Sequence, residues 1–412
     1  MKKTLLLLLL AAISYAFATP CLFAQSATDN PVVSLYTSEK NEELTLTITA
    51  NAPIRVLWGG TEKSYTIAEL DESAGDITGT APDGTIHIYT TNNAIEKLTV
   101  GGMALTRLDL LGVEALTELS ATGNELSEVN LEKCTALTYL NLSRNPLTSI
   151  SLLRQEKLED LRLDGCGLKQ VDLTPCSNLK NLSVGGNALA ALDLKLSLLE
   201  SIDCSRNSLA SGISFKACPA LQTVKAKKCN LTSLDLSGLT KLTKLEASGN
   251  KLTVVKLKDN QVLSTIDLTE NLLDACALDA FYRALPEKSA KTTYGKDLLV
   301  KNNPGAKTAK SDLAEEKRWT IDQKGDGSGC ETALESIGEE PLVRAFAHDG
   351  LIWIVTPRDG YQIRVYDLMG RSLYAQMGVA GTQALEMALP SGTYLVSVQW
   401  GTNLPITQRI VL

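Results

Sequence analysis

Side chains suited to catalysis are scarce in this sequence. Its two histidines, His87 and His348, lie in different regions, and His87 alternates with Ile86 and Ile88 as an exposed strand residue would. The sequence contains no HExxH helix motif, GxSxG nucleophile elbow or P-loop, and no CxxC pair to hold zinc. No pair of carboxylates stands apart from the others. We therefore expect a protein without enzyme activity, metal or cofactor.

Charged and aromatic side chains suited to binding gather in the middle of the chain. Tyr139, Arg144 and Arg162 are candidates because tyrosine and arginine dominate binding hot spots. A second candidate group is basic and comprises Lys225, Lys227 and Lys228. An ordinary solvated surface is the alternative interpretation for each of them. The formal net charge of −7 argues against nucleic acid or an anionic membrane as the main partner, since both favour a basic face.

Both groups lie within a frame of leucines that repeats nine times. The frame has the form LxxLxLxxNxL, as in 137–147 (LTYLNLSRNPL). It starts at Ile95, Leu116, Leu137, Leu158, Leu179, Leu199, Leu221, Leu242 and Leu263, at intervals of 21 residues except for one of 20 and one of 22. Each repeat is too short to bury its own leucines, so the repeats must stack around a shared core. The strand period of two turns positions 4 and 6 inward and position 5 outward.

This frame resembles the leucine-rich repeat, and its short period is similar to that of bacterial, internalin-like repeats. The resemblance covers residues 95–275 and implies a repeat solenoid with a parallel β-sheet. Its concave face would present positions 3, 5, 7 and 8, where polar residues dominate and Tyr139 is the single aromatic residue. A second L-x-L unit, as in 234–236 (LDL), would form the opposite wall.

Position 9 of the frame is most often asparagine. The asparagines there are Asn124, Asn145, Asn187, Asn207, Asn250 and Asn271. An amide both donates and accepts hydrogen bonds, so a structural ladder of these side chains can satisfy the buried backbone where each strand turns. A polar binding ladder is the alternative. Met103, Cys166 and Cys229 occupy position 9 in three repeats, and this hydrogen bonding is expected to weaken there.

The nine cysteines fit the core of such a solenoid better than a disulfide framework. Cys134, Cys176 and Cys218 recur two repeats apart, which is about 10 Å by strand spacing. A disulfide needs Cα atoms within about 7 Å of each other. Buried free thiols are therefore predicted for this set, whereas the pairing of Cys276 and Cys330, which lie outside the regular frame, stays open.

Residues 1–24 predict a secretory signal peptide. Lys2 and Lys3 precede a short apolar run, and Ala24 provides a small residue for cleavage. A membrane-anchoring helix is one alternative, although the run is short for a bilayer. A lipid-modified Cys21 is another, although the residues before it match that motif poorly. The mature protein is then expected to pass through the periplasm, without a transmembrane span.

The regions beside the repeats are expected to cover the ends of the leucine core, because exposed ends would aggregate. Residues 25–94 alternate apolar and polar side chains and predict a β-rich N-terminal cap domain. Residues 276–321 predict a C-terminal cap with one short helix at 278–285. Residues 322–340 begin with DQKGDGSG and predict a linker.

Residues 341–412 predict a small Ig-like β-sandwich, because strand-like runs alternate with Gly and Pro. Two segments, 365–371 (VYDLMGR) and 389–394 (LPSGTY), resemble motifs of type IX secretion sorting domains. The matching residues, with a basic residue in the final strand, are Tyr366, Asp367, Gly370, Arg371, Pro390, Gly392, Tyr394 and Arg409. The resemblance implies a Bacteroidetes-type cell whose outer-membrane machinery recognises the tail and often cleaves it. A second binding module of immunoglobulin type is the alternative.

Two functions of different classes follow from these features. The first is a secreted or cell-surface recognition protein, an adhesin or a host or biofilm interaction factor. It would bind a protein or glycan through its concave face and leave the cell by the type IX secretion system. The second is a structural spacer or assembly protein of the cell envelope without an external ligand, which the aromatic-poor face keeps open. The sequence identifies neither the ligand nor the oligomeric state.

Overall fold

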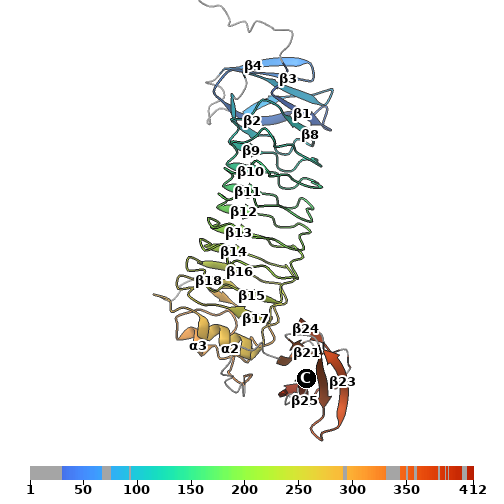
Figure 1. Cartoon of the computed structure of the whole chain (residues 1–412), viewed down its shortest axis with the longest axis vertical. Coiled ribbons are helices and arrows are strands. Elements are labelled where there is room, and N and C mark those ends of the chain that lie inside the picture. The colour runs from blue at the N-terminus through green and yellow to red at the C-terminus, as the bar shows by residue number, and fades with distance from the viewer. Residues whose placement is uncertain are drawn as a thin grey trace, which may run out of the picture.

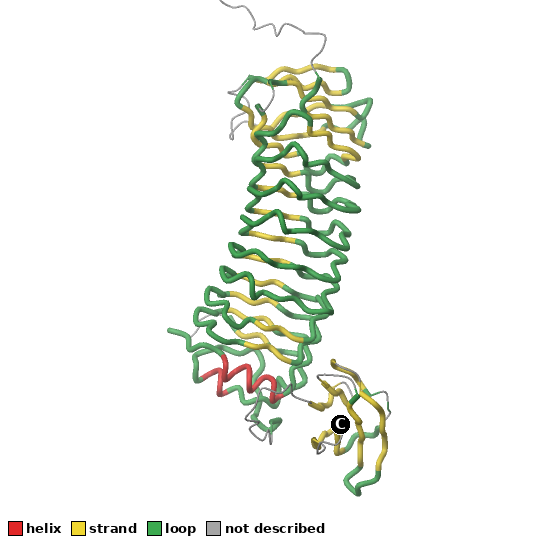
Figure 2. The backbone as a smooth tube through the Cα atoms, viewed as in Figure 1, coloured by secondary structure: helices red, strands yellow, loops and turns green. Residues whose placement is uncertain are grey.

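The computed structural model describes residues 30–66, 76–91, 94–290, 295–330, 344–348, 351–356, 360–378, 381–385, 387, 389–400 and 406–412. The predicted signal peptide lies outside the described residues. Most of the described chain is one stack of short strands joined by loops, as Figure 1 shows from β9 to β18. Figure 2 shows that strands occupy one wall of the stack and that loops form most of the other. The chain is a parallel β-solenoid.

The main sheet of the solenoid has 12 strands, ten of which run parallel. In spatial order these ten are β19 (Leu298–Leu299), β18 (Thr265–Asp267), β16 (Lys244–Glu246), β14 (Thr223–Lys225), β13 (Ser201–Asp203), β12 (Asn181–Ser183), β11 (Asp160–Arg162), β10 (Tyr139–Asn141), β9 (Glu118–Ser120) and β7 (Ile95–Thr99). Equivalent frame positions face each other in neighbouring strands, so Leu140 pairs with Leu119 on one side and Leu161 on the other. This register places the same position of every repeat in one row along the sheet.

The leucines of the frame form the core. Leu140 and Leu142, at positions 4 and 6 of one repeat, are fully buried, and each such side chain contributes about 2 kcal/mol relative to exposure. On the opposite wall, Leu234 of the L-x-L unit is buried too. In the repeats after the first, regular pairing on this wall is limited, among the described residues, to the parallel strands β15 (Ser233–Asp235) and β17 (Val254–Lys256).

The N-terminal region continues both walls of the solenoid. On the main sheet, β2 (Leu44–Ala50) pairs antiparallel with β7, and β5 (Asp76–Gly79) pairs with β2. On the other wall a five-stranded antiparallel sheet has the order β4 (Thr61–Tyr65), β3 (Ile54–Trp58), β6 (Thr85–Tyr89), β1 (Val33–Thr37) and β8 (Leu105–Leu110). Because β8 belongs to the first repeat, the N-terminal strands and the solenoid share one hydrophobic core.

His87 on β6 is half-buried rather than exposed as the alternation predicts. Its Nδ1 lies 2.9 Å from the hydroxyl of Ser34 on the neighbouring strand β1. The rings of Tyr36 and Tyr89 contact the imidazole edge-on. These neighbours give the side chain a packing role in the five-stranded sheet.

After the ninth repeat the chain forms one helix and returns to the sheet. The helix α2 (Ala275–Ala284) begins three residues before the predicted start, because the Asp274 carboxylate accepts a hydrogen bond from the Ala277 N–H at 2.7 Å and caps it. The chain then adds β19 beside β18 as a tenth turn of the solenoid. No helix among the described residues is long and apolar enough to cross a membrane.

Residues 322–330 pack onto this end of the solenoid, so the prediction of a linker beginning at 322 is wrong for them. The Asp322 carboxylate accepts a hydrogen bond from Val300 N–H at 2.7 Å. A Cβ on Gly325 would lie 2.2 Å from the Ala309 carbonyl oxygen, which explains the glycine. A disulfide joins Cys276 on α2 to Cys330, with 5.0 Å between the Cα atoms. The short helix α3 (Asp312–Glu315) completes this end.

The C-terminal region has its own hydrophobic core. One antiparallel sheet has the order β20 (Arg344–His348), β21 (Leu351–Thr356) and β24 (Gly381–Ala384). The other has the order β23 (Ser372–Gly378), β22 (Tyr361–Tyr366), β25 (Thr393–Trp400) and β26 (Ile406–Val411). Ile354 of the first sheet and Val365 and Val396 of the second are fully buried in the core that the two sheets share.

Candidate functional site

The outward side chains at positions 3, 5 and 7 of the repeats form an uninterrupted surface, which we call the strand face. Tyr139 lies on it at position 3 of β10, between Glu118 of β9 and Asp160 of β11. Arg162 of β11 places its guanidinium carbon 5.4 Å from the centroid of the Tyr139 ring. The structure therefore brings together two of the three residues predicted as a binding patch.

Arg162 is held in this position by a carboxylate. Its Nε and Nη2 atoms lie 3.0 and 3.2 Å from the two oxygens of Asp160. This hydrogen bonding raises the pKa of Arg162 above its ordinary value. Asn141 donates a hydrogen bond to the Tyr139 hydroxyl at 3.3 Å. The ring, the guanidinium and the carboxylate thus form one ordered cluster on the strand face.

A hollow of about 300 Å³ opens beside Tyr139, toward the N-terminal end of the strand face. We call it the N-terminal hollow. Its walls come from β2, β7, β9 and β10, and its lining residues are Thr47, Thr49, Lys97, Thr99, Glu118, Ser120 and Tyr139. Of these lining residues, only Tyr139 is predicted from the sequence as a binding residue. The other six form rows across the strands that follow from the register, so the frame positions of Lys97, Thr99, Glu118 and Ser120 carried a usable signal.

Arg144, the third residue of the predicted patch, lies at the turn after β10, at position 8. Position 8 has a positive φ in all ten turns, at Gly102, Gly123, Arg144, Gly165, Gly186, Arg206, Lys228, Gly249, Glu270 and Asn302. The φ of Arg144 is 59°, a conformation that costs a non-glycine residue about 1 kcal/mol. Arg144 is exposed there, so its long side chain is held on a strained backbone at the edge of the strand face.

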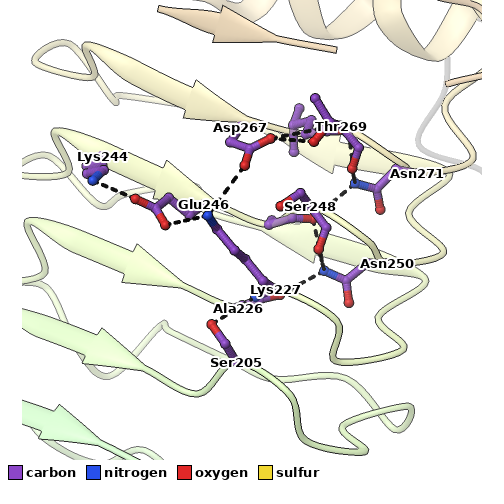
Figure 3. A network of polar contacts seen from close by, with 12 residues as sticks. Ser205, Ala226, Lys227, Lys244, Glu246, Ser248, Asn250, Asp267, Thr269 and Asn271 are labelled. Atoms are coloured by element: carbon purple, nitrogen blue, oxygen red, sulfur yellow. Dashed lines mark hydrogen bonds and ion pairs between the residues drawn. The ribbon is translucent and has the colours of Figure 1, made fainter. Parts of the chain in front are cut away.

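The predicted basic group is not a free positive patch. Figure 3 shows the Lys227 side chain reaching toward the next strand, where its Nζ lies 2.8 Å from Glu246 and 3.6 Å from Asp267 of the following strand. Lys244 approaches the other Glu246 oxygen at 2.5 Å. We call Lys227, Lys244, Glu246 and Asp267 the ion network. Sequence spacing does not show the pairing of Lys227, because its partners Glu246 and Asp267 lie in later repeats.

The charges of the ion network stabilise one another. Burial by itself raises the pKa of Glu246, but the hydrogen bonds from Lys227 and Lys244 outweigh this and leave the pKa below its ordinary value. The hydrogen bond to Glu246 raises the pKa of Lys227 in turn. Lys225 is half-buried on β14, and Lys228 is exposed at the following turn. Of the three lysines predicted as a basic group, the central one, Lys227, is therefore paired with carboxylates, and a binding role for the group stays a prediction.

The position-9 asparagines bind the backbone of adjacent repeats. Asn124 illustrates the pattern: its Oδ1 accepts from the N–H groups of Met103 and Leu105 at 2.9 and 3.1 Å. Its Nδ2 donates to the carbonyls of Val100 and Ala121 at 2.8 and 2.9 Å. The side chain is 6% exposed, so it is hidden from any partner on the strand face. Figure 3 shows the equivalent bond from Asn250 to the Ala226 carbonyl of the preceding repeat, and further bonds from Asn250 and Asn271 to the carbonyls of Ser248 and Thr269.

Cys166 shows what changes when position 9 lacks an amide. Its thiol lies 3.3 Å from the Leu142 carbonyl, the acceptor that an asparagine Nδ2 would use. It has no oxygen for the Leu147 N–H, which donates instead to the Asn145 carbonyl at 2.8 Å. One of the bonds between repeats is therefore replaced by a bond within a repeat.

A further ladder asparagine, Asn303, is not predicted by the repeat frame. Its Oδ1 accepts from Leu273 N–H at 3.0 Å, and its Nδ2 donates to Leu268 and Val300 carbonyls at 2.8 and 2.9 Å. The segment 298–303 (LLVKNN) has the spacing of frame positions 4 to 9. The insertion of α2 delays it beyond the regular interval, which conceals it from a search at a fixed period.

The free cysteines lie in the core. Cys134, Cys166, Cys176, Cys204, Cys218 and Cys229 are all buried and reduced. Burial raises the pKa of Cys134 and of Cys176 to about 12, so both thiols stay protonated and unreactive at neutral pH. Among the described residues, no three His, Cys, Asp or Glu side chains are grouped to hold a metal ion.

The residues of the first sorting-like motif form the hairpin turn between β22 and β23. The Asp367 carboxylate accepts hydrogen bonds from the N–H groups of Met369 and Arg371, each at 2.9 Å. It also accepts one from Arg371 Nε at 2.7 Å. These bonds, led by the one from the Arg371 backbone, lower the pKa of Asp367. Gly370 has a φ of +79°, which explains the glycine.

The second motif joins the end of the chain to the start of β25. The Tyr394 hydroxyl donates to the Pro390 carbonyl at 2.6 Å. Gly392 and Leu412 exchange two backbone hydrogen bonds, of 3.1 and 2.8 Å. Arg409 is exposed on β26, and Tyr366 ends β22. The motif residues thus shape the turns and the terminus of the C-terminal region.

No protein-family model and no curated protein sequence matches the chain. Among solved structures, YopM from Yersinia enterocolitica WA-314 is 26% identical over 47% of this chain, with a TM-score of 0.39, and the match spans only 39% of that protein. The functional domain of InlJ from Listeria monocytogenes, described as including a cysteine ladder, is 17% identical over 77% of this chain and 80% of its own, with a TM-score of 0.35. A leucine-rich repeat protein of Leptospira interrogans is 19% identical over 52% of this chain and 62% of its own, with a TM-score of 0.40.

Proposed function

We propose that this is a secreted or cell-surface recognition protein that binds a protein or glycan partner through the strand face. The observation that carries the proposal is the strand face itself. It presents the same frame positions in ten parallel strands, and the N-terminal hollow lies beside its one aromatic residue, Tyr139. A rigid, repetitive surface of this kind places side chains for a partner at fixed spacing. Neither catalysis nor a cofactor enters the proposal.

Export of the chain is supported by two independent features. The disulfide between Cys276 and Cys330 fits an oxidising compartment outside the cytoplasm. The C-terminal motifs resemble type IX sorting domains, and their residues build one hairpin turn and the contact at the chain end. We propose that the C-terminal region is the export signal, that residues 1–24 are removed, and that the N-terminal strands and residues 276–330 cover the two ends of the leucine core.

Localisation in the native cell tests this proposal. The full chain is compared with a chain that ends after Cys330, so that the disulfide is kept and the C-terminal region is lost. Surface protease shaving and mass spectrometry should find the full chain outside the cell and the shortened chain in the periplasm. Equal surface exposure of both chains would contradict a sorting role. A full chain that stays within the envelope and binds neither proteins nor glycans would favour the alternative of a structural spacer.

A further inference from the structure

The N-terminal hollow differs chemically from the rest of the strand face. Its row at position 5 consists of the hydroxyl residues Thr47, Thr99 and Ser120, which lie side by side on β2, β7 and β9. Thr47 donates its hydroxyl proton to Asp76 at 2.6 Å. Among the described residues, the hydroxyls of Thr99 and Ser120 make no hydrogen bond, and the same holds for Thr49 in the adjacent row. These groups are available to a ligand, and each can both donate and accept.

The two charged residues that line the hollow, Lys97 and Glu118, cancel each other's formal charge. Lys97 and Glu118 occupy neighbouring strands at position 3, and their charged atoms are 3.2 Å apart. Arg162, beyond Tyr139, is paired with Asp160. No unpaired cation remains at these positions to attract an anionic ligand. A ligand that matches this surface is uncharged and rich in hydroxyl groups.

Tyr139 supplies the apolar surface. Arg162 covers its ring from the β11 side, whereas the hollow lies toward β9 on the other side of β10. A ligand in the hollow therefore meets the side of the ring that the guanidinium leaves open. Sugars suit such a site, because a pyranose ring has an apolar C–H surface that packs on an aromatic ring and hydroxyls around its edge.

We propose that the N-terminal hollow binds a neutral saccharide, with Tyr139 as the packing surface and Thr49, Thr99 and Ser120 as hydrogen-bond partners. The proposal rests on the proposed function and specifies its ligand class. The volume of about 300 Å³ is at the lower end for small-molecule sites, so one or two sugar residues occupy it and the remainder of a longer chain extends along the strand face.

The test uses the full chain after signal removal. An array carries immobilised neutral hexose and N-acetylhexosamine oligosaccharides together with sulfated and sialylated ones. Oligosaccharides that bind are then titrated by calorimetry. We expect binding of neutral members, loss of about tenfold or more in affinity for Tyr139→Ala, and a loss below about threefold for Tyr139→Phe, which keeps the ring.

A matched pair of substitutions tests the hydroxyls. Thr49→Val removes a half-buried hydroxyl inside the hollow, opposite Lys97 at position 3, and Thr223→Val removes one at position 3 on the distant strand β14. The first should weaken saccharide binding by about fivefold, and the second should leave it unchanged. Circular dichroism and thermal melting of every variant separate lost binding from lost folding.

Several results would overturn the inference. They are an array on which no saccharide binds, a preference for the sulfated or sialylated members, and saccharide binding that Tyr139→Ala leaves intact. The wider proposal is judged separately, by a display library of extracellular proteins probed with the same chain. A protein that binds in place of saccharides would overturn the ligand class alone, whereas blanks in both experiments would overturn the recognition function as well.

Discussion

The two ends of the strand face have the same backbone arrangement but present different side chains. Near the N-terminus, β2, β7 and β9 present hydroxyls that have no partner within the described structure, beside the ring of Tyr139. Near the C-terminal end of the face, the segment after β14 and the strands β16 and β18 present the ion network, in which Lys227 bridges to carboxylates on the next two strands. Both ends have the same register and the same leucine core.

The difference teaches that charge is a poor guide to a binding surface on this solenoid. Neighbouring strands lie about 4.8 Å apart and bring charged residues of adjacent repeats within reach of each other, so opposite charges in the same or neighbouring positions pair internally. Glu246 is in contact with both Lys227 and Lys244. Within the described structure, the hydroxyls of Thr49, Thr99 and Ser120 at the N-terminal hollow make no such pair. The N-terminal end is therefore the better candidate for recognition, and the following experiments test that contrast.

The largest expected effect is on the stability of the C-terminal end, where a disulfide links two parts of the chain. The disulfide between Cys276 and Cys330 closes 54 residues of sequence onto α2, and its loss should cost the C-terminal end roughly 3–4 kcal/mol. In the double variant Cys276→Ser and Cys330→Ser, hydrogen exchange should accelerate in β18 and β19 and stay unchanged in β2, β7 and β9. Saccharide binding at the N-terminal hollow should survive. Equal acceleration of hydrogen exchange at both ends would show that the solenoid unfolds as one unit and that its two ends do not differ in stability.

The asparagine ladder should matter equally at both ends. Asn124→Ala and Asn250→Ala each leave buried backbone groups without partners, so each should lower the free energy of unfolding by about 2–4 kcal/mol. Asn145→Cys should cost about half as much, because a thiol keeps the bond to the preceding repeat that Cys166 makes. Urea unfolding of the three variants measures this. If only one of Asn124→Ala and Asn250→Ala lowers the free energy of unfolding, the ladder stabilises that end of the solenoid alone.

Much of the solenoid follows from the sequence because its information is local and repeated. The frame fixes the strands, the inward leucines, the position of each ladder asparagine and the unpaired thiols of Cys134 and Cys176. The tenth turn escaped because α2 interrupts the period before Asn303. The packing of residues 322–330 could not be predicted, because a glycine-rich segment resembles a linker unless its close contacts are known.

The candidate site was harder to predict than the fold. Tyr139 and Arg162 follow from frame positions, whereas the N-terminal hollow needs the antiparallel pairing of β2 with β7. That pairing lies between a strand of the repeat and one from outside it, so no period in the sequence reports it. The pairing of Lys227 is hidden from the sequence for a related reason: its carboxylate partners belong to later repeats, and only the register brings Glu246 beside it.

Arg144 allows a test of whether the strain of its backbone outweighs the stabilising contacts of its side chain. Arg144→Gly should raise the free energy of unfolding by about 1 kcal/mol, because glycine adopts a φ of 59° without strain. The converse change Gly165→Ala, at the same position of the next repeat, should lower it by a similar amount. Urea unfolding compares the two. If Arg144→Gly is destabilising, the side chain makes contacts that outweigh the strain of its backbone.

The smallest effect concerns the ion network and depends on pH. Glu246 has a pKa below its ordinary 4.5 in the folded chain, so its ionised form stabilises the fold at neutral pH. That stability is present above the unfolded pKa and is lost as the pH falls through the folded pKa. Glu246→Gln should therefore cost about 0.5 kcal/mol at pH 7, less in high salt, and almost nothing once the wild-type carboxylate is protonated.

Matched melts across pH check this sign. Asp203→Asn, at position 5 of a repeat outside the ion network, serves as the control and should lack the salt dependence. If the difference between Glu246→Gln and the wild type grows as the pH falls, Glu246 is not held ionised by the two lysines. The C-terminal end would then have an unsatisfied charge after all, and its lysines would again compete with the N-terminal hollow as the surface that a partner recognises.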